Sequence, residues 1–229
     1  EKIGEEYLKP VLQICDSFDE IDFEKLPNQF VMKCNHGSKW QYIIKDKEDY
    51  VKTPAFIEIT RRNMTGWLEQ EFWTWEGFEM QYKGIEPKIL IEPLLRDREN
   101  AACEEIFVFC FSGKGKLAIR LYGNKEDGIS LYDEELNLTT DIFNFSEPKI
   151  KKEADEKVRL AVSLAEKLSK EFKFVRVDFM VYQNKLYFEE LTFTPYSGFK
   201  NFTDMESELR LGKWLNLEIS DSRDCHSTI

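Results

Sequence analysis

The sequence predicts an α+β fold that is built from antiparallel β-hairpins and packed helices. Three pairs of apolar runs, within residues 30–45, 105–122 and 172–193, are each joined by a short polar stretch, as expected for hairpins. Residues 150–172 place apolar side chains at i, i+3, i+4 and i+7, which indicates a helix with one buried face. With 229 residues, 42% of them hydrophobic, the chain is long enough for one domain or two small lobes.

Residues 1–29 are polar and contain two prolines, and we interpret them as the lead-in from a preceding lobe. A short helix interrupted at Pro10 is expected over residues 5–14. The chain begins at Glu1 and not at methionine, which allows an upstream domain in a longer multidomain protein.

Residues 30–33 and 41–45 predict two strands, and the small polar turn between them resembles a loop that covers a phosphate. Gly37 would let backbone N–H groups approach an anion, and Lys33 or Lys39 would supply positive charge. The alternative is an ordinary turn, because a single glycine is common in turns.

A helix is expected over residues 56–75, where an aromatic cluster favours packing over ligand binding. Residues 88–92 predict a buried strand that Pro93 ends. Glu92, Pro93 and Leu94 would then lie at a crossover between lobes, where backbone groups can recognise an adenine edge.

Residues 105–112 and 116–122 predict a second hairpin, joined through residues 113–115. Arg120 lies in the middle of its second strand, and either an acidic partner or a phosphate suits its guanidinium group equally. Residues 124–148 are polar and predict loops, residues 209–217 follow the last hairpin, and residues 221–229 are expected to form a disordered end.

The third hairpin carries the candidate metal site. Arg176 and Asp178 share one face of its first strand, and Phe188, Glu190 and Thr192 share one face of its second. A three-residue loop over residues 183–185 would oppose Asp178 to Glu190, and the facing carboxylates would repel unless a cation such as Mg²⁺ lay between them. A two-residue loop would instead oppose Asp178 to Glu189, and a solvated surface hairpin is the other alternative.

Charge and cysteine content exclude some classes of protein. The net charge of −11 argues against a general nucleic-acid binder. Five scattered cysteines without a CxxC pair favour free thiols in a reducing compartment, so a cytoplasmic location is expected. No apolar run approaches the length of a transmembrane segment, and no signal peptide is recognisable.

Three stretches together resemble the ATP-grasp superfamily, and specifically its TupA-like branch, which is tied to cell-surface polysaccharide biosynthesis. They are FVMKCNHGSKWQYIIKDK, PKILIEPLL and VRVDF…LYFEELTFTPYSG, and the resemblance spans residues 1–215. It implies an ATP-grasp fold, in which two lobes of antiparallel sheet with packed helices clamp a nucleotide. The small lobe would be residues 30–92, and the large lobe, with the metal site, residues 93–229.

The resemblance also implies ATP and Mg²⁺ as cofactors and assigns roles to individual residues. Arg176 and Lys33 would be catalytic, and the metal ligands would be Asp178, Glu190 and Thr192, with Thr192 standing where the family usually has Asn. Arg120 is a further candidate for the nucleotide site, whose other expected residues are Lys33, Asn35, His36, Gly37, Ser38, Glu92, Pro93 and Leu94.

The activity implied by the resemblance is an ATP-dependent carboxylate–amine ligase that works through an acyl phosphate. Its partners would be a small-molecule or glycan carboxylate, such as a uronic acid of a capsular or cell-wall precursor, and an amino acid or amino alcohol. Two alternatives stay open: a phosphotransferase on the same fold, and a non-catalytic nucleotide-binding accessory domain in polysaccharide biosynthesis.

Overall fold

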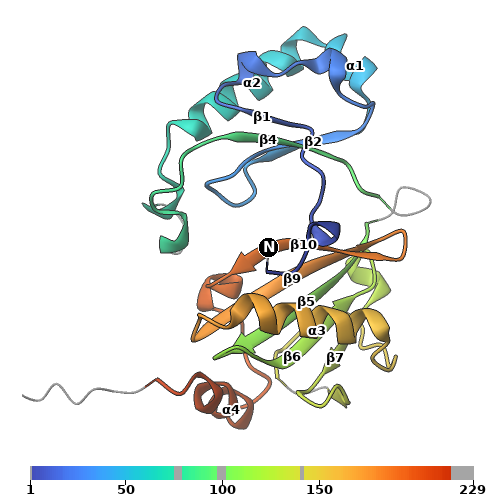
Figure 1. Cartoon of the computed structure of the whole chain (residues 1–229), viewed down its shortest axis with the longest axis vertical. Helices are drawn as coiled ribbons and strands as arrows, with labels where there is room; N and C mark the ends of the chain where they lie inside the picture. The colour runs from blue at the N-terminus through green and yellow to red at the C-terminus, as the bar shows by residue number, and fades with distance from the viewer. Residues whose placement is uncertain (1, 75–78, 97–101, 140–141, 218–229) are drawn as a thin grey trace, which may run out of the picture.

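The protein folds into two lobes, each built on one antiparallel sheet, which confirms the α+β prediction (Figure 1). The computed structural model describes residues 2–74, 79–96, 102–139 and 142–217. The small-lobe sheet has the strand order β1-β4-β2-β3, and the large-lobe sheet has the order β10-β9-β5-β6-β7-β8. Trp75 and the expected disordered end, residues 221–229, lie outside the described residues.

The small lobe packs its sheet against a helix on the side away from the large lobe (Figure 1). Its elements are β1 (Gln13–Cys15), β2 (Phe30–Cys34), β3 (Gln41–Ile44), α1 (Lys47–Val51), α2 (Pro54–Leu68) and β4 (Ile89–Pro93). Strand alternation buries Phe30, Met32, Ile89 and Ile91 against Met64 of α2. The opposite face of β2, which carries Lys33, is left for the cleft between the lobes.

The large lobe contains the second and third predicted hairpins and two strands that the sequence did not indicate. Its elements are β5 (Glu104–Phe111), β6 (Lys114–Leu121), β7 (Ile129–Tyr132), β8 (Leu138–Thr139), α3 (Glu156–Ser169), β9 (Phe174–Tyr182), β10 (Lys185–Thr192) and α4 (Met205–Leu215). All four residues of β7 are buried, so this strand lacks the alternation that identifies a half-buried strand.

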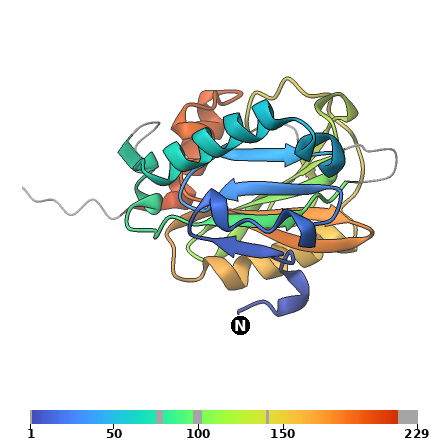
Figure 2. The ribbon, with the colours of Figure 1, turned by 90° about the horizontal axis from the view of Figure 1, so that it is seen from above.

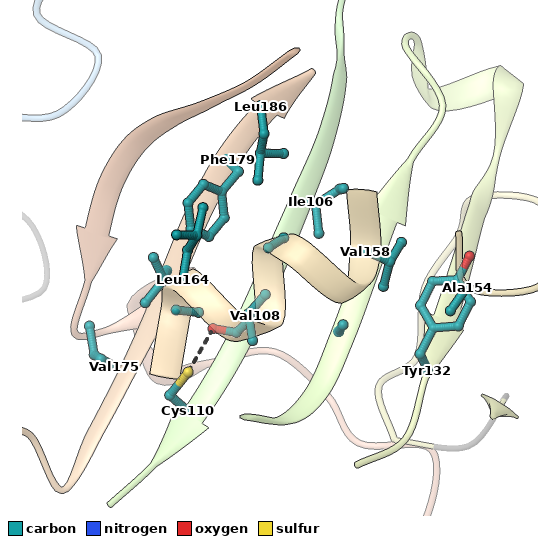
Figure 3. Close-up of a cluster of buried hydrophobic side chains, with 14 residues drawn as sticks. Ile106, Val108, Cys110, Tyr132, Ala154, Val158, Leu164, Val175, Phe179 and Leu186 are labelled. Atoms are coloured by element: carbon teal, nitrogen blue, oxygen red, sulfur yellow. Dashed lines mark hydrogen bonds between the residues drawn. The ribbon is translucent and has the colours of Figure 1, made fainter. Parts of the chain in front are cut away.

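Helix α3 covers one face of the large sheet (Figure 3). It buries Val158, Ala161, Leu164 and Ala165 against β5 and β9 residues. The helix begins at residue 156 and not at 150 as predicted. Two observations explain this: Asp155 caps the helix by accepting hydrogen bonds from the backbone of residues 157 and 158, and residues 148–150 hydrogen-bond to Ile129 instead.

The other face of the large sheet is divided between a second core and the cleft. Phe109, Phe111, Leu117 and Ile119 pack at one end with residues of α4, such as Trp214. At the other end Glu105, Phe107, Arg176 and Asp178 point toward the small lobe. One end of this face thus belongs to a hydrophobic core, and the other end lines the cleft between the lobes.

The described part of the lead-in, residues 2–29, contributes to both lobes. The expected helix over residues 5–14 is replaced by a short 3-10 turn, Glu5–Tyr7, and by β1, which pairs with β4. Figure 2 shows this dark-blue strand beside the green β4. Leu8 forms a bridge to Phe188 of β10, so the chain crosses between the lobes here as well as after Pro93. Within the described part of the chain, no helix has the length and apolar character needed to traverse a bilayer.

Candidate active site

A cleft of about 650 Å³ separates the two lobes, a size typical of small-molecule sites. One wall comes from β2, the turn after it and the start of β3, and the other from β5, β9 and β10. The lining residues include three lysines, Lys9, Lys33 and Lys39, and four acids, Glu105, Asp178, Glu189 and Glu190.

The β9–β10 hairpin places Asp178 opposite Glu190 and Arg176 opposite Thr192, as predicted, but the predicted loop length is wrong. The turn has two residues, Gln183 and Asn184, both with positive φ, which is the geometry of a type I′ hairpin turn. That turn alone would oppose Asp178 to Glu189. A β-bulge between Phe188 and Glu190 inserts one extra residue and shifts the register back.

The bulge also separates Phe188 from the acidic face, which corrects a second expectation. Phe188 pairs with Phe179 and packs in the core beneath α3, so it lies on the opposite side of the sheet from Glu190. Glu189 and Glu190 both line the cleft because the bulge disrupts the alternation between them. We call the four acids of the cleft, Glu105, Asp178, Glu189 and Glu190, the acidic corner. The acidic corner therefore carries one more carboxylate than the regular hairpin would provide.

Arg176 binds Asp178 through two hydrogen bonds in a geometry that suits a guanidinium–carboxylate pair. Its Nε and Nη2 atoms donate to the two carboxylate oxygens of Asp178 at 2.7 and 2.6 Å. Nη2 lies 3.8 Å from Oε1 of Glu190, and the Thr192 hydroxyl lies 2.8 Å from that same oxygen. Arg176 therefore offsets part of the repulsion between the two facing carboxylates.

The acidic corner still has more carboxylates than cations. Burial raises the pKa of Asp178 to about 7, because desolvation and the neighbouring Glu190 and Glu189 outweigh the opposing effect of Arg176. Burial, with Glu189 and Asp178, also raises the pKa of Glu105 to about 7. Such pKa shifts mean that an added cation would stabilise the ionised cluster.

The donor set fits Mg²⁺ rather than a metal held by protein ligands alone. The described residues contain no group of three or more His, Cys, Asp or Glu side chains already arranged around a metal position. Mg²⁺ usually binds one or two carboxylates and completes its shell with water and phosphate oxygens. Asp178 and Glu190 supply that number of carboxylates, and the Thr192 hydroxyl hydrogen-bonds within the same cluster.

The turn after β2 closes over the other side of the cleft. Gly37, Ser38 and Lys39 line it, and a Cβ at Gly37 would lie 2.5 Å from the Trp40 ring, so only glycine fits there. The Asn35 side chain binds the backbone of residues 86 and 88, at 3.0 and 2.8 Å, and so ties the turn to the start of β4. Asn35 therefore shapes the turn as well as lining the cleft.

Lys33 and Lys9 bind the same acid. Lys33 Nζ lies 2.7 Å from Oε1 of Glu92, and Lys9 Nζ lies 3.6 Å from Oε2 of Glu92 and 3.1 Å from Oε1 of Glu189. Lys9 thus links the small lobe to the bulge of β10 while its side chain is only 14% exposed. Sequence reasoning missed Lys9, because a single lysine in a polar lead-in forms no recognisable pattern.

Six predicted site residues are not among the residues that line the cleft: His36, Glu92, Pro93, Leu94, Arg120 and Thr192. His36 is buried, with Nε2 at 3.0 Å from the backbone oxygen of Trp67, and supports the turn from behind. Arg120 lies on the α3 side of the large sheet, where it binds Glu104 and the helix cap Asp155 at 2.9 and 2.7 Å. Of the two alternatives for Arg120, the structure shows the acidic partners.

The expected adenine-reading segment leads out of the small lobe. Pro93 is the last residue of β4 and pairs with Phe30, and the Leu94 backbone N–H donates to Gln29. Glu92 is buried and points to the cleft side of the sheet, where Lys33 and Lys9 hold it. These residues thus lie at one of the two crossings between the lobes.

A family model described as TupA-like ATPgrasp matches residues 1–216. The match covers most of the chain and all the elements of the cleft. No curated protein matches the sequence.

Solved ATP-grasp structures are similar to the chain at low sequence identity. The D-alanine–D-alanine ligase from Bacillus anthracis is 18% identical, with a TM-score of 0.45 over 92% of this chain and 60% of that one. The D-cycloserine synthetase DcsG is 14% identical, with a TM-score of 0.46 over 91% and 65%. The ATP-grasp ligase PsnB, complexed with a minimal precursor, is 12% identical, with a TM-score of 0.44 over 91% and 53%. The chain therefore spans less than two thirds of each of these longer proteins.

Proposed function

The chain belongs to the TupA-like ATP-grasp family, and from that premise we propose that it is an ATP-dependent carboxylate–amine ligase. The observation that supports this most strongly is the arrangement around the cleft. A pair of facing carboxylates, Asp178 and Glu190, lies with Arg176 on one wall, and a glycine turn with two lysines forms the other.

The two walls of the cleft would bind different parts of a nucleotide–Mg²⁺ complex. Lys33, Lys39 and the backbone of the Gly37 turn would hold the nucleotide phosphates, since these groups supply positive charge and N–H donors. Asp178 and Glu190 would hold Mg²⁺, with Thr192 orienting the carboxylate of Glu190 through its hydroxyl.

ATP with Mg²⁺ would supply the phosphoryl group that activates the acceptor carboxylate as an acyl phosphate, which an amine then attacks with release of phosphate. Arg176 would place positive charge beside the acceptor, and its pair with Asp178 fixes the orientation of the guanidinium group. The buried position of Asp178, which is only 3% exposed, keeps water from that pair. This chemistry requires no side-chain nucleophile.

We propose further that the acceptor is a uronic acid of a capsular or cell-wall polysaccharide precursor and that the amine is an amino acid or amino alcohol. The support is the tie of the TupA-like branch to surface polysaccharides. A cytoplasmic location is part of the proposal, and the free, buried thiols of Cys15, Cys34 and Cys110 support a reducing compartment.

The direct test incubates the protein with Mg²⁺ and ATP, glucuronic acid and an amine such as alanine, and measures ADP and free phosphate. We expect both products only when the acid and the amine are present together. A phosphorylated sugar without free phosphate would instead support a phosphotransferase. ATP binding without ADP release for any acid–amine pair tested would support the accessory domain.

A further inference from the structure

A basic and aromatic patch lies beside the Arg176 end of the cleft. We call it the Phe145 patch, and its members are Phe145, Lys149, Tyr196 and Lys200. It combines two chain segments, one between β8 and α3 and the other after β10. A backbone hydrogen bond of 2.9 Å from Asn144 to Asn201 and a bridge between Phe143 and Phe202 hold these segments together.

Both lysines of the patch lie over the same aromatic ring. The Nζ atoms of Lys149 and Lys200 are 4.6 and 4.4 Å from the centroid of Phe145, within the range of a cation–π contact. Burial and the neighbouring Lys200 lower the pKa of Lys149, and Glu147 opposes them. Two ammonium groups that lie against one ring repel each other, so the binding of an anion beside them would be favourable.

No carboxylate of the described residues pairs directly with either lysine of the patch. Among the residues that the structure describes, neither Lys149 nor Lys200 has a carboxylate oxygen within 4.0 Å, whereas the cleft lysines Lys9 and Lys33 are both paired. Glu147 is near enough to influence the pKa of Lys149 without pairing with it. In a chain of net charge −11, two neighbouring lysines that have no ion pair among the described residues would favour the binding of an anion.

Tyr196 connects the patch to the candidate active site. Its ring centroid lies 5.5 Å from the guanidinium carbon of Arg176 and 5.3 Å from Nζ of Lys200. The ring of Phe145 meets it nearly edge-on, at 71° and 6.5 Å. Tyr196 is 39% exposed, so a ligand that spans from Arg176 to Lys200 would pass over an accessible aromatic ring.

The backbone fixes Tyr196 in this position. Tyr196 and Ser197 adopt left-handed conformations with φ of 55° and 53°, which non-glycine residues rarely adopt. Strained conformations of this kind persist where the surrounding structure determines them, and they concentrate at ligand sites. The loop directly follows β10, which carries Glu190 and Thr192, so Tyr196 lies only a few residues along the chain from these two side chains.

We propose that the Phe145 patch binds a second anionic group of the acceptor. The inference rests on the ligase function proposed above and narrows its substrate class to a small acid with two negative groups. One group, the carboxylate that reacts, would lie at Arg176, and the other, a phosphate, sulfate or second carboxylate, would be bound by Lys149 and Lys200. The rings of Tyr196 and Phe145 would line the path of the apolar face of a sugar between them.

The test compares the binding of glucuronic acid 1-phosphate and glucuronic acid to the full chain by calorimetry, without ATP. The wild type should bind the phosphorylated acid about tenfold or more tightly than the plain acid, as a charge-assisted contact predicts. The double variant Lys149→Gln/Lys200→Gln should lose this preference. The matched control, Lys151→Gln/Lys167→Gln, removes the same charge from two exposed positions and should retain it.

Three results would overturn the proposal. One is that both double variants prefer glucuronic acid 1-phosphate over glucuronic acid to the same extent. Another is a preference that survives in Lys149→Gln/Lys200→Gln but disappears in Lys33→Gln, because the probe would then occupy the nucleotide side of the cleft. The third is ADP release with glucuronic acid 1-phosphate at an unchanged KM in Lys149→Gln/Lys200→Gln, which would support the ligase while rejecting the patch. Failure of the ligase assay alone leaves the binding comparison intact, so the two proposals fail separately.

Discussion

The small-lobe wall of the cleft and the large-lobe wall differ in charge and in how their charges are held. On the small-lobe wall, Lys33 is partly exposed and pairs with one buried acid, Glu92. On the large-lobe wall, Asp178 is almost fully buried and three further acids approach it around a single Arg176. One wall thus offers cations to an anionic ligand, and the other carries more carboxylates than the two cations, Arg176 and Lys9, that pair with them. Under the proposed function, a nucleotide accompanied by Mg²⁺ would satisfy both walls, and variants on each wall test this difference.

The largest effect on activity is expected from Glu190→Gln on the large-lobe wall. Turnover should fall by about 10² to 10³, as for removal of one charge-stabilising group at a reacting centre, while the melting temperature is unchanged or higher because a repulsion is relieved. ADP release and thermal melting measure the two effects. Glu189→Gln is the matched control, since Glu189 lies one residue away and pairs with Lys9. Equal, near-wild-type rates in both variants would exclude the metal site.

The second effect, on nucleotide binding, is expected on the small-lobe wall. Lys33→Ala should weaken ATP binding by about tenfold, because one charge-assisted contact to a phosphate is lost. Lys45→Ala, at an exposed position just after β3, is the control and should bind ATP like the wild type. Calorimetric titration with ATP and Mg²⁺ measures both. An unchanged affinity in Lys33→Ala would remove Lys33 from the nucleotide site.

The third effect concerns the contact between the walls. Lys9→Met leaves Glu92 and Glu189 without their shared cation, and the melting temperature should fall by about 5 °C, which corresponds to ~2 kcal/mol in a chain of this size. Lys2→Met breaks an exposed pair with Glu171 and should change stability little. If the two variants melt alike, Lys9 does not link the lobes.

The smallest effect is a pH dependence of the unliganded protein. A carboxyl whose pKa is raised in the folded state binds its proton more tightly there than in the unfolded chain. The unfolding free energy should therefore fall as pH rises from about 4, the ordinary pKa of an unfolded carboxyl, to about 7, the pKa of Asp178 and Glu105.

Glu105→Gln isolates part of this dependence. Denaturant melts at pH 5 and pH 7 should show a smaller difference in unfolding free energy for the variant than for the wild type. The same difference in both proteins would show that Glu105 ionises normally. Glu69→Gln serves as the control, because Glu69 is an exposed acid at the end of α2. This variant should show the same difference in unfolding free energy as the wild type.

The central hairpin shows how far the sequence could predict the site. The pairing of Asp178 with Glu190 was predicted correctly, but from a loop of the wrong length, because period-two alternation cannot reveal one extra residue in a strand. The bulge at Glu189 restores the pairing and adds a carboxylate to the cleft. Local pattern thus predicted which acids meet, and the backbone irregularity that brings them together required the structure.

Other differences arise from contacts between distant parts of the chain. The face of the sheet on which Arg120 lies depends on the pairing of β6 with β5 and on the helix cap at Asp155, 35 residues away. His36 is adjacent to Gly37 in the predicted turn, yet the side chain of His36 is buried in the small lobe, where it contacts the backbone oxygen of Trp67. Lys9 reaches the site only because the lead-in crosses between the lobes. Sequence periodicity carries no information on such contacts.

The most direct test of the two-wall account is a thermal-shift titration with ATP and Mg²⁺ together and with each alone, on the wild type and on Glu190→Gln. A ligand that binds the native state raises its stability with concentration. The account predicts a larger rise with both ligands than the sum of the separate rises in the wild type, and no such excess in Glu190→Gln. An absence of any rise in the wild type, or the same excess in the variant, would contradict it.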